Sequence, residues 1–293
     1  MDSLSRLTSV LHKALHRGTA MEKFGKSQPV KRVEDQRFLT GHGRYVDDIA
    51  PQNALRLFVF RSPVAHATIT ALNLDDARAA EGVHLILTAE DLEAAGVKMD
   101  IHATVVPNRD GSQGAKPERP ILARGKVRFV GEPVAAIVAE TLAQAKDAAD
   151  LIEFDYEELP AHMDLATGGA AIHDEAPDNR AFDWGMGDEA ATQAAFDAAA
   201  QTVSMEIGDN RIIVNSMEPR GCYAEWEGDR LHLSVNGQGV WGEKNRMVKA
   251  FGLSPDQVRV TNPDVGGGFG MKGMSYPEHY MVSQAARVLA RPV

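Results

Sequence analysis

The chain has 293 residues, enough for one large or two ordinary domains, and its hydrophobic content of 44% is sufficient to form a core. Its net charge of −10 argues against binding to nucleic acid or to an anionic membrane, because both require a basic surface. No apolar run is long enough to span a bilayer. The only cysteine, Cys222, excludes an internal disulfide and a cysteine-based metal site, and this composition favours a cytoplasmic protein.

The first 24 residues differ from the rest of the chain. Met1 to Ala20 carries basic residues, few acidic ones, and leucines at helical spacing, which is compatible with a transit peptide. We favour a disordered arm, or a true start at Met21. Residues 1–24 are therefore expected to be an extension rather than part of a domain.

The next part of the chain predicts short strands and one capped helix. Leu55–Arg61 and Val83–Leu87 are apolar enough to be buried strands. Thr88 stands three residues before Asp91, which is the spacing of a capping box, and Gly96 is placed to end the helix that follows.

The clearest local pattern lies between residues 134 and 159. Val134–Ala139 is a continuous apolar strand, and Thr141 with Gln144 repeats the capping-box spacing before a helix. Apolar residues then alternate with acidic ones at Ile152–Tyr156, as in a strand with one face in water. A strand, a helix and a strand in so few residues predict a mixed α/β layer.

Three segments have little periodicity. Arg37–Asp48 contains two glycines and predicts a turn-rich entry, and Met99–Arg119 is polar and predicts an exposed loop. Residues 161–188 contain paired glycines, a proline and several acids, and we interpret them as a linker between two domains, 25–160 and 189–293.

The second domain is expected to alternate helices and strands. A glycine-containing turn between two of its apolar segments is a hairpin signal. The predicted helices are Glu189–Ala200, Trp241–Phe251 (ended by Gly252) and Ser275–Ala290; the predicted strands are Thr202–Ile207, Gly221–Trp226, Leu231–Asn236 and Gln257–Asn262.

The run Asp264–Lys272 contains four glycines and one phenylalanine between two predicted elements. Glycine loses more backbone freedom on folding than any other residue, so such a cluster needs a reason. One reason is an anionic ligand lying against backbone N–H groups near a helix N-terminus; a tight turn or close packing is the alternative. The run is not a P-loop, because glycine follows Lys272, and it lacks the spacing of a dinucleotide fingerprint.

Gln238 lies between two glycines directly after a predicted strand, so its amide can face a cleft bounded by the later glycine run; a solvated turn residue is the alternative. Nucleophilic catalysis has no support, since the chain has no nucleophile elbow and no histidine lies near Cys222 in sequence. His66 is interpreted as a structural histidine with satisfied hydrogen bonds.

Five segments in the same order resemble the molybdenum-binding large subunit of the xanthine dehydrogenase and aldehyde oxidase family, most closely its aerobic carbon monoxide dehydrogenase-like branch. The resemblance runs from about Gly25 to Val293. It is carried by Arg37–Asp48, Arg61–Ala67, Gly131–Ala136, Met217–Arg220 and Asp264–Gly270.

The resemblance implies an α/β (α+β) fold, with the family's hammerhead domain followed by the first part of a molybdopterin-binding domain. It implies a molybdenum ion held by a pterin dithiolene rather than by side chains. Gln238 matches the glutamine whose amide donates to the apical ligand of the molybdenum. The cofactor-binding loop corresponds to Gly267, Gly268, Phe269 and Gly270.

The resemblance also implies an oxidoreductase that hydroxylates an aldehyde, carbon monoxide or an N-heterocycle, with iron–sulfur clusters on a small subunit and FAD on a medium subunit. Gly273 replaces a glutamate of the xanthine-oxidising branch, which argues against xanthine as the substrate. The family's general base belongs to a longer segment, so this chain is expected to be an N-terminal part that is inactive alone. The alternatives are a module that completes a split large subunit with a second chain, and a decayed gene product.

Overall fold

The computed structural model describes residues 31–101 and 105–293, and the chain divides into two units, Met1–Gly43 and Arg44–Val293. The described part of the first unit contains one helix, α2 (Asp35–Leu39), which has no buried residue. The expected extension at residues 1–24 lies outside the described residues. No helix in the described ranges is long and apolar enough to cross a membrane.

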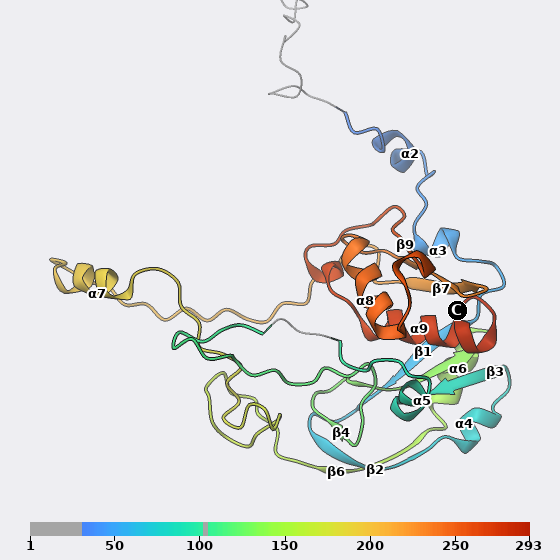
Figure 1. The fold of residues 1–293 in the computed structure, drawn as a ribbon, viewed down its shortest axis with the longest axis horizontal. Coiled ribbons are helices and arrows are strands. Elements are labelled where there is room, and N and C mark those ends of the chain that lie inside the picture. The colour runs from blue at the N-terminus through green and yellow to red at the C-terminus, as the bar shows by residue number, and fades with distance from the viewer. Residues whose placement is uncertain (1–30, 102–104) are drawn as a thin grey trace, which may run out of the picture. The chain divides into compact units, whose positions relative to one another are not determined.

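The second unit begins with two three-stranded antiparallel sheets (Figure 1). In the first sheet, β5 lies between two other strands and is buried at every position, as its continuous apolar sequence predicts. In the second sheet, the first positions of β6 alternate between exposed and partly buried, as its sequence predicts. In order, the strands are β1 (Arg56–Arg61), β5 (Pro133–Ala139) and β3 (Val83–Leu87), then β4 (Lys126–Val127), β2 (Ala67–Asn73) and β6 (Glu153–Glu158).

Short helices connect and cover these strands. Both predicted capping boxes are present, at Thr88 for α5 and at Thr141 for α6, and Gly96 adopts a left-handed φ of 75° after α5. The alanines of α6 pack against β1 and β5 in a shared core. The helices are α3 (Val46–Ile49), α4 (Asp75–Ala79), α5 (Ala89–Ala94) and α6 (Leu142–Ala149).

Replacing Thr88 with alanine should lower the free energy of unfolding by about 1 kcal/mol, because Thr88 Oγ1 accepts a hydrogen bond from the Asp91 N–H that no helical carbonyl satisfies. Urea denaturation of the variant measures this loss. Glu90→Ala, at an exposed position of the same helical turn, is the control and should change stability less. An equal loss in both variants would contradict a capping role.

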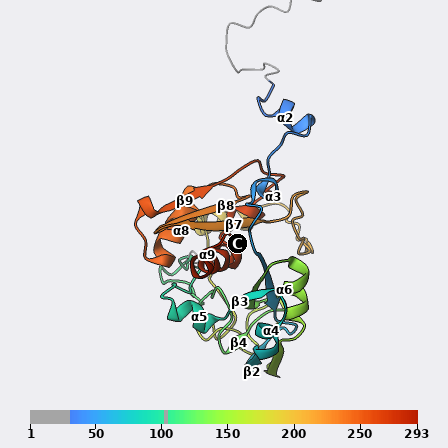
Figure 2. The same ribbon diagram turned by 90° about the vertical axis from the view of Figure 1, so that its right-hand side faces the viewer.

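The second half of this unit contains a sheet with the order β7-β8-β9, in which β7 and β8 are antiparallel and β8 and β9 are parallel. Figure 2 shows α8 and α9 on the same side of this sheet, where they share a core with β8. The elements are β7 (Cys222–Glu227), β8 (Arg230–Val235), α8 (Trp241–Phe251), η1 (Pro255–Gln257), β9 (Val258–Thr261), η2 (Met271–Gly273) and α9 (Pro277–Leu289), preceded by α7 (Glu189–Asp197).

The two halves of the second unit are joined by backbone pairing as well as by a common core. Val293 exchanges two hydrogen bonds with Ala224 of β7, at 2.9 and 3.0 Å, and the Pro292 carbonyl accepts one from Leu55 at 2.8 Å. A groove of about 690 Å³ continues from this point between β1 and β7.

Three predictions of local structure are wrong. Thr202–Ile207 is not a strand: no described segment pairs with it, and its apolar side chains are exposed. Arg37–Asp48 is turn-like only in its middle, because it overlaps the end of α2 and the start of α3. Met99–Arg119 is not wholly an exposed loop, since Met99 and Ile101 face the core and Ile101 N–H bonds to Arg119.

Candidate cofactor-binding site

The glycine run lies in the loop between β9 and α9 and has an unusual backbone. Gly267, Phe269 and Gly270 have positive φ values of 101°, 50° and 85°. A positive φ is strained for phenylalanine, and its ring is 75% exposed, so burial of the ring does not offset that strain. Strained, exposed residues of this kind are typical of functional loops.

Gln238 lies beside this loop, as its position after β8 predicts. A side chain at position 268 would place its Cβ 2.7 Å from Cδ of Gln238, so the Gln238 carboxamide rests against the bare α-carbon of Gly268. The Gln238 N–H also bonds to the carbonyl of Lys272 at 3.0 Å. The glutamine and the glycine loop therefore form one wall.

This wall carries hydrogen-bond donors that the described part of the chain leaves unused. The N–H groups of Gly267, Gly268, Phe269 and Gly270 donate to no acceptor among the described residues, and neither does the side-chain amide of Gln238. Successive free N–H groups beside a neutral amide form a donor surface that suits an anionic or oxygen-rich ligand. Residues 267–270 and Gln238 are half-exposed or exposed, so these donors are accessible to a ligand from solvent.

Two residues that the sequence reasoning did not select hold the base of the loop. Oε2 of Glu218 accepts hydrogen bonds from Gly266 N–H at 2.8 Å and from Nζ of Lys272 at 3.0 Å. Burial alone raises the pKa of the Glu218 carboxyl, but hydrogen bonds from Gly266, Asn236 and Lys272 outweigh it and hold that pKa below its usual value. Glu218 and Lys272 are 54 positions apart, so no local sequence pattern predicts that they form an ion pair.

Two asparagines fix the neighbouring turns. Asn236 accepts from Gly221 N–H at 2.9 Å and donates to the Pro219 carbonyl at 2.7 Å. Asn262 accepts from Gly237 N–H at 3.1 Å and donates to its carbonyl at 2.8 Å. The three turns that carry Glu218, Gln238 and the glycine run are thus joined by side chains rather than by a sheet.

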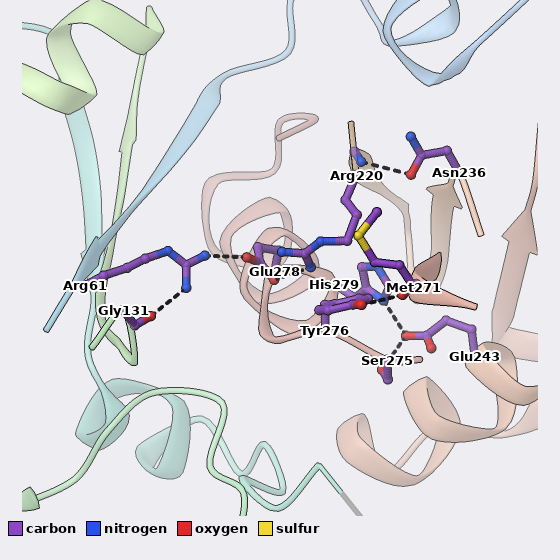
Figure 3. A network of polar contacts seen from close by, with 11 residues as sticks. Arg61, Gly131, Arg220, Asn236, Glu243, Met271, Ser275, Tyr276, Glu278 and His279 are labelled. Atoms are coloured by element: carbon purple, nitrogen blue, oxygen red, sulfur yellow. Dashed lines mark hydrogen bonds and ion pairs between the residues drawn. The ribbon is translucent and has the colours of Figure 1, made fainter. Parts of the chain in front are cut away.

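A buried polar cluster joins α8 to the start of α9 (Figure 3). Oε1 of Glu243 accepts from Ser275 Oγ at 2.9 Å and lies 2.8 Å from Nδ1 of His279. Burial raises the pKa of the Glu243 carboxyl, but these contacts and the charge of Arg246 outweigh it, so the pKa is lowered. The Tyr276 hydroxyl donates to the Met271 carbonyl and so ties this cluster to the loop.

An ion-pair network crosses from β1 to α9 (Figure 3). Arg61 donates to Glu278 at 2.6 Å and to the Gly131 carbonyl at 3.0 Å, and the Arg220 guanidinium lies 3.6 Å from the centre of the Tyr276 ring. This network connects three of the segments that carry the family resemblance.

The remaining candidates for chemistry are structural. No group of His, Cys, Asp and Glu within the described ranges is arranged to hold a metal ion. Burial raises the pKa of the Cys222 thiol, which keeps it protonated and unreactive. His66 is buried and Nδ1 lies 2.8 Å from the Pro160 carbonyl, but Nε2 has no partner among the described residues, so the prediction of full satisfaction is wrong.

Comparison with known families identifies both halves of the second unit. Residues 40–160 match the family model of the aldehyde oxidase and xanthine dehydrogenase a/b hammerhead domain, and residues 172–293 match that of the molybdopterin cofactor-binding domain. The chain belongs to the aldehyde oxidase and xanthine dehydrogenase family. The α+β fold expected from the resemblance, a hammerhead domain followed by a molybdopterin-binding domain, is confirmed.

Curated relatives are similar over nearly the whole chain. The nicotine 6-hydroxylase large subunit of Paenarthrobacter nicotinovorans is 36% identical over 90% of this chain and 32% of the relative. The carbon monoxide dehydrogenase large chain of Hydrogenophaga pseudoflava is 34% identical over 89% of this chain and 33% of the relative. The chain therefore spans about a third of the length of these relatives.

Solved structures are also similar over nearly the whole chain. The quinoline 2-oxidoreductase of Pseudomonas putida 86 superimposes with a TM-score of 0.75 at 35% identity, covering 90% of this chain and 33% of that one. A Cu,Mo-CO dehydrogenase superimposes with a TM-score of 0.76 at 30% identity, covering 90% and 34%.

Proposed function

We propose that this chain supplies part of the molybdenum-cofactor site of a molybdenum hydroxylase large subunit. The observation that carries the proposal is the wall of unused donors formed by residues 267–270 and the Gln238 amide. The donor set fits the group, because neutral N–H donors stabilise negative charge on a bound cofactor without carrying a competing charge. No side chain is needed as a metal ligand when a pterin dithiolene holds the metal.

In this proposal the bound cofactor supplies the two-electron redox chemistry, and the chain supplies binding and orientation. Gly267, Gly268, Phe269 and Gly270 would donate backbone hydrogen bonds, and Gln238 would donate its side-chain N–H. The exposed Phe269 would cover one side of the site and limit the approach of water.

The substrate we propose is an aldehyde, carbon monoxide or an N-heterocycle, with water as the oxygen source. The names of the relatives and of the solved structures, which include nicotine, carbon monoxide and quinoline, support this class. Gly273 supports the same substrate class. A Cβ at position 273 would lie 4.0 Å from Gln238, so this position is next to the proposed site. Glycine has no carboxylate there that could hold a purine.

We further propose that the complete enzyme contains an iron–sulfur small subunit and an FAD medium subunit in the cytoplasm. The domain limits we propose are 25–160 for the hammerhead domain and 189–293 for the molybdopterin-binding part, with 161–188 as a linker. The family matches overlap these limits and differ from them by up to seventeen residues at one boundary, since the second match begins at residue 172.

Purification from a host that makes molybdopterin tests the cofactor proposal. We expect pterin, measured by the fluorescence of its oxidised form, and molybdenum, measured by mass spectrometry, to co-purify with the folded chain. A folded chain free of both, alone and with the partner subunits co-expressed, would overturn it.

The same preparation tests activity. We expect no steady oxidation of aldehydes, carbon monoxide or N-heterocycles by the chain alone with a dye acceptor, because none of the residues placed at the site is a general base. A full-length relative purified in parallel is the positive control. Sustained turnover by the chain alone would contradict this prediction.

A further inference from the structure

The base of the glycine loop is held by one carboxylate oxygen. Oε2 of Glu218 bonds to Gly266 N–H at the start of the loop and to the Lys272 ammonium at its end. The Lys272 side chain is only 1% exposed and that of Glu218 is 16% exposed. The two ends of the loop are therefore fixed to a common point outside the loop.

Lys272 also contacts Gln238. Its carbonyl accepts the Gln238 N–H at 3.0 Å, while its ammonium binds Glu218. One residue thus links the carboxylate, the glycine loop and the glutamine. A displacement of Lys272 would change the distance between the free N–H groups and the Gln238 amide.

Glu218 packs directly against the α-carbon of Gly266. A Cβ at position 266 would lie 2.5 Å from Cβ of Glu218 and 3.3 Å from its backbone nitrogen, so only glycine fits there. The second carboxylate oxygen, Oε1, is buried with no partner among the described residues. The Glu218 carboxylate is therefore held in one position by the loop that it anchors.

Packing alone does not explain this pair. A buried ion pair loses solvation for both charges, and apolar residues of similar volume usually stabilise a fold as well or better. Buried ionic groups fix one arrangement over others in several proteins, which matters where donors must be held within a fraction of an ångström.

We infer that Glu218 and Lys272 are positioning residues that set the spacing between the N–H donors of residues 267–270 and the Gln238 amide. The inference rests on the proposed function of this site. Neither charged group belongs to the donor wall, so both act through the backbone that they hold.

The double variant Glu218→Gln/Lys272→Met tests the inference, because it removes both charges while keeping similar shapes. Hydrogen exchange of the Gly266, Gln238 and Met271 amides gives a readout that needs no cofactor. We expect exchange at these three amides to be about ten-fold faster or more, with the melting temperature close to that of the parent chain. Pterin content should fall about ten-fold in the same variant.

Glu225→Gln is the matched control, since Oε1 of Glu225 lies 2.8 Å from Nδ1 of His232 on β8 and has no contact with the loop among the described residues. It should leave exchange and pterin content unchanged. Should the double variant fail to fold, Glu218→Asp, which keeps the charge but shortens its reach, replaces it with the same expected changes.

The outcomes separate the two proposals. Unchanged exchange at the three amides overturns the positioning role whatever the pterin content. Retention of full pterin by a folded variant whose parent binds pterin also overturns it and leaves the proposed function intact. A parent chain that carries no pterin or molybdenum, alone and with the partner subunits co-expressed, defeats the proposed function, and the exchange experiment still decides the positioning role.

Discussion

Gly268→Val is expected to reduce pterin content per chain about ten-fold or more, with little change in the melting temperature. A Cβ at this position would lie 2.7 Å from Cδ of Gln238 and 2.8 Å from its Cγ, so the glutamine must move away from the loop. The loop surface itself is half-exposed, and the fold can absorb this displacement. Pterin fluorescence of the purified variant measures the loss.

Gly242→Ala in α8 is the control for this experiment. A Cβ there meets Nη1 of Arg246 at 3.6 Å, an ordinary contact, and alanine favours a helix. This control should retain pterin. A Gly268→Val chain that binds pterin as well as the control would show that Gln238 is not part of the site.

Leu233→Ala should lower the free energy of unfolding by about 2–5 kcal/mol, the largest stability effect we expect from a single substitution here. Leu233 is fully buried in β8, between β7 and β9, in the core that α8 and α9 cover. Since β8 leads directly into Gln238, the loss of packing should also reduce pterin content. Urea denaturation followed by circular dichroism measures the stability change.

Leu165→Ala makes the same chemical change at a fully exposed position and should be nearly neutral. If the two variants lose similar stability, the core assignment of β8 is wrong.

Local signals predicted most of the elements of the second unit. The capping boxes at Thr88 and Thr141 name the first turn of a helix, and Gly252 ends α8 in the left-handed conformation that its position predicts. The continuous apolar run of β5 likewise predicts a central strand. Capping boxes, a terminal glycine and an apolar run can all be predicted because each depends on residues within a few positions of one another.

The wrong predictions concern segments whose structure depends on residues far away in the sequence. The segment Thr202–Ile207 has a strand-like pattern but no described strand beside it, and a strand without a hydrogen-bonded neighbour is unstable. Conversely, Met99 and Ile101 lie in a polar segment, and its composition does not predict that they are buried. Both side chains nevertheless pack in the core formed by other elements.

The candidate site shows the same division. The sequence by itself determined its parts: a glycine run after β9, a glutamine between glycines after β8, and the family to which both belong. Only the tertiary structure decided that the Gln238 carboxamide rests on Gly268, that four N–H groups find no acceptor among residues 31–101 and 105–293, and that Glu218 and Lys272 close the loop. The physical reason is range, because backbone conformation is set by near neighbours, whereas donor spacing depends on charges and side chains brought together from positions far apart in the chain.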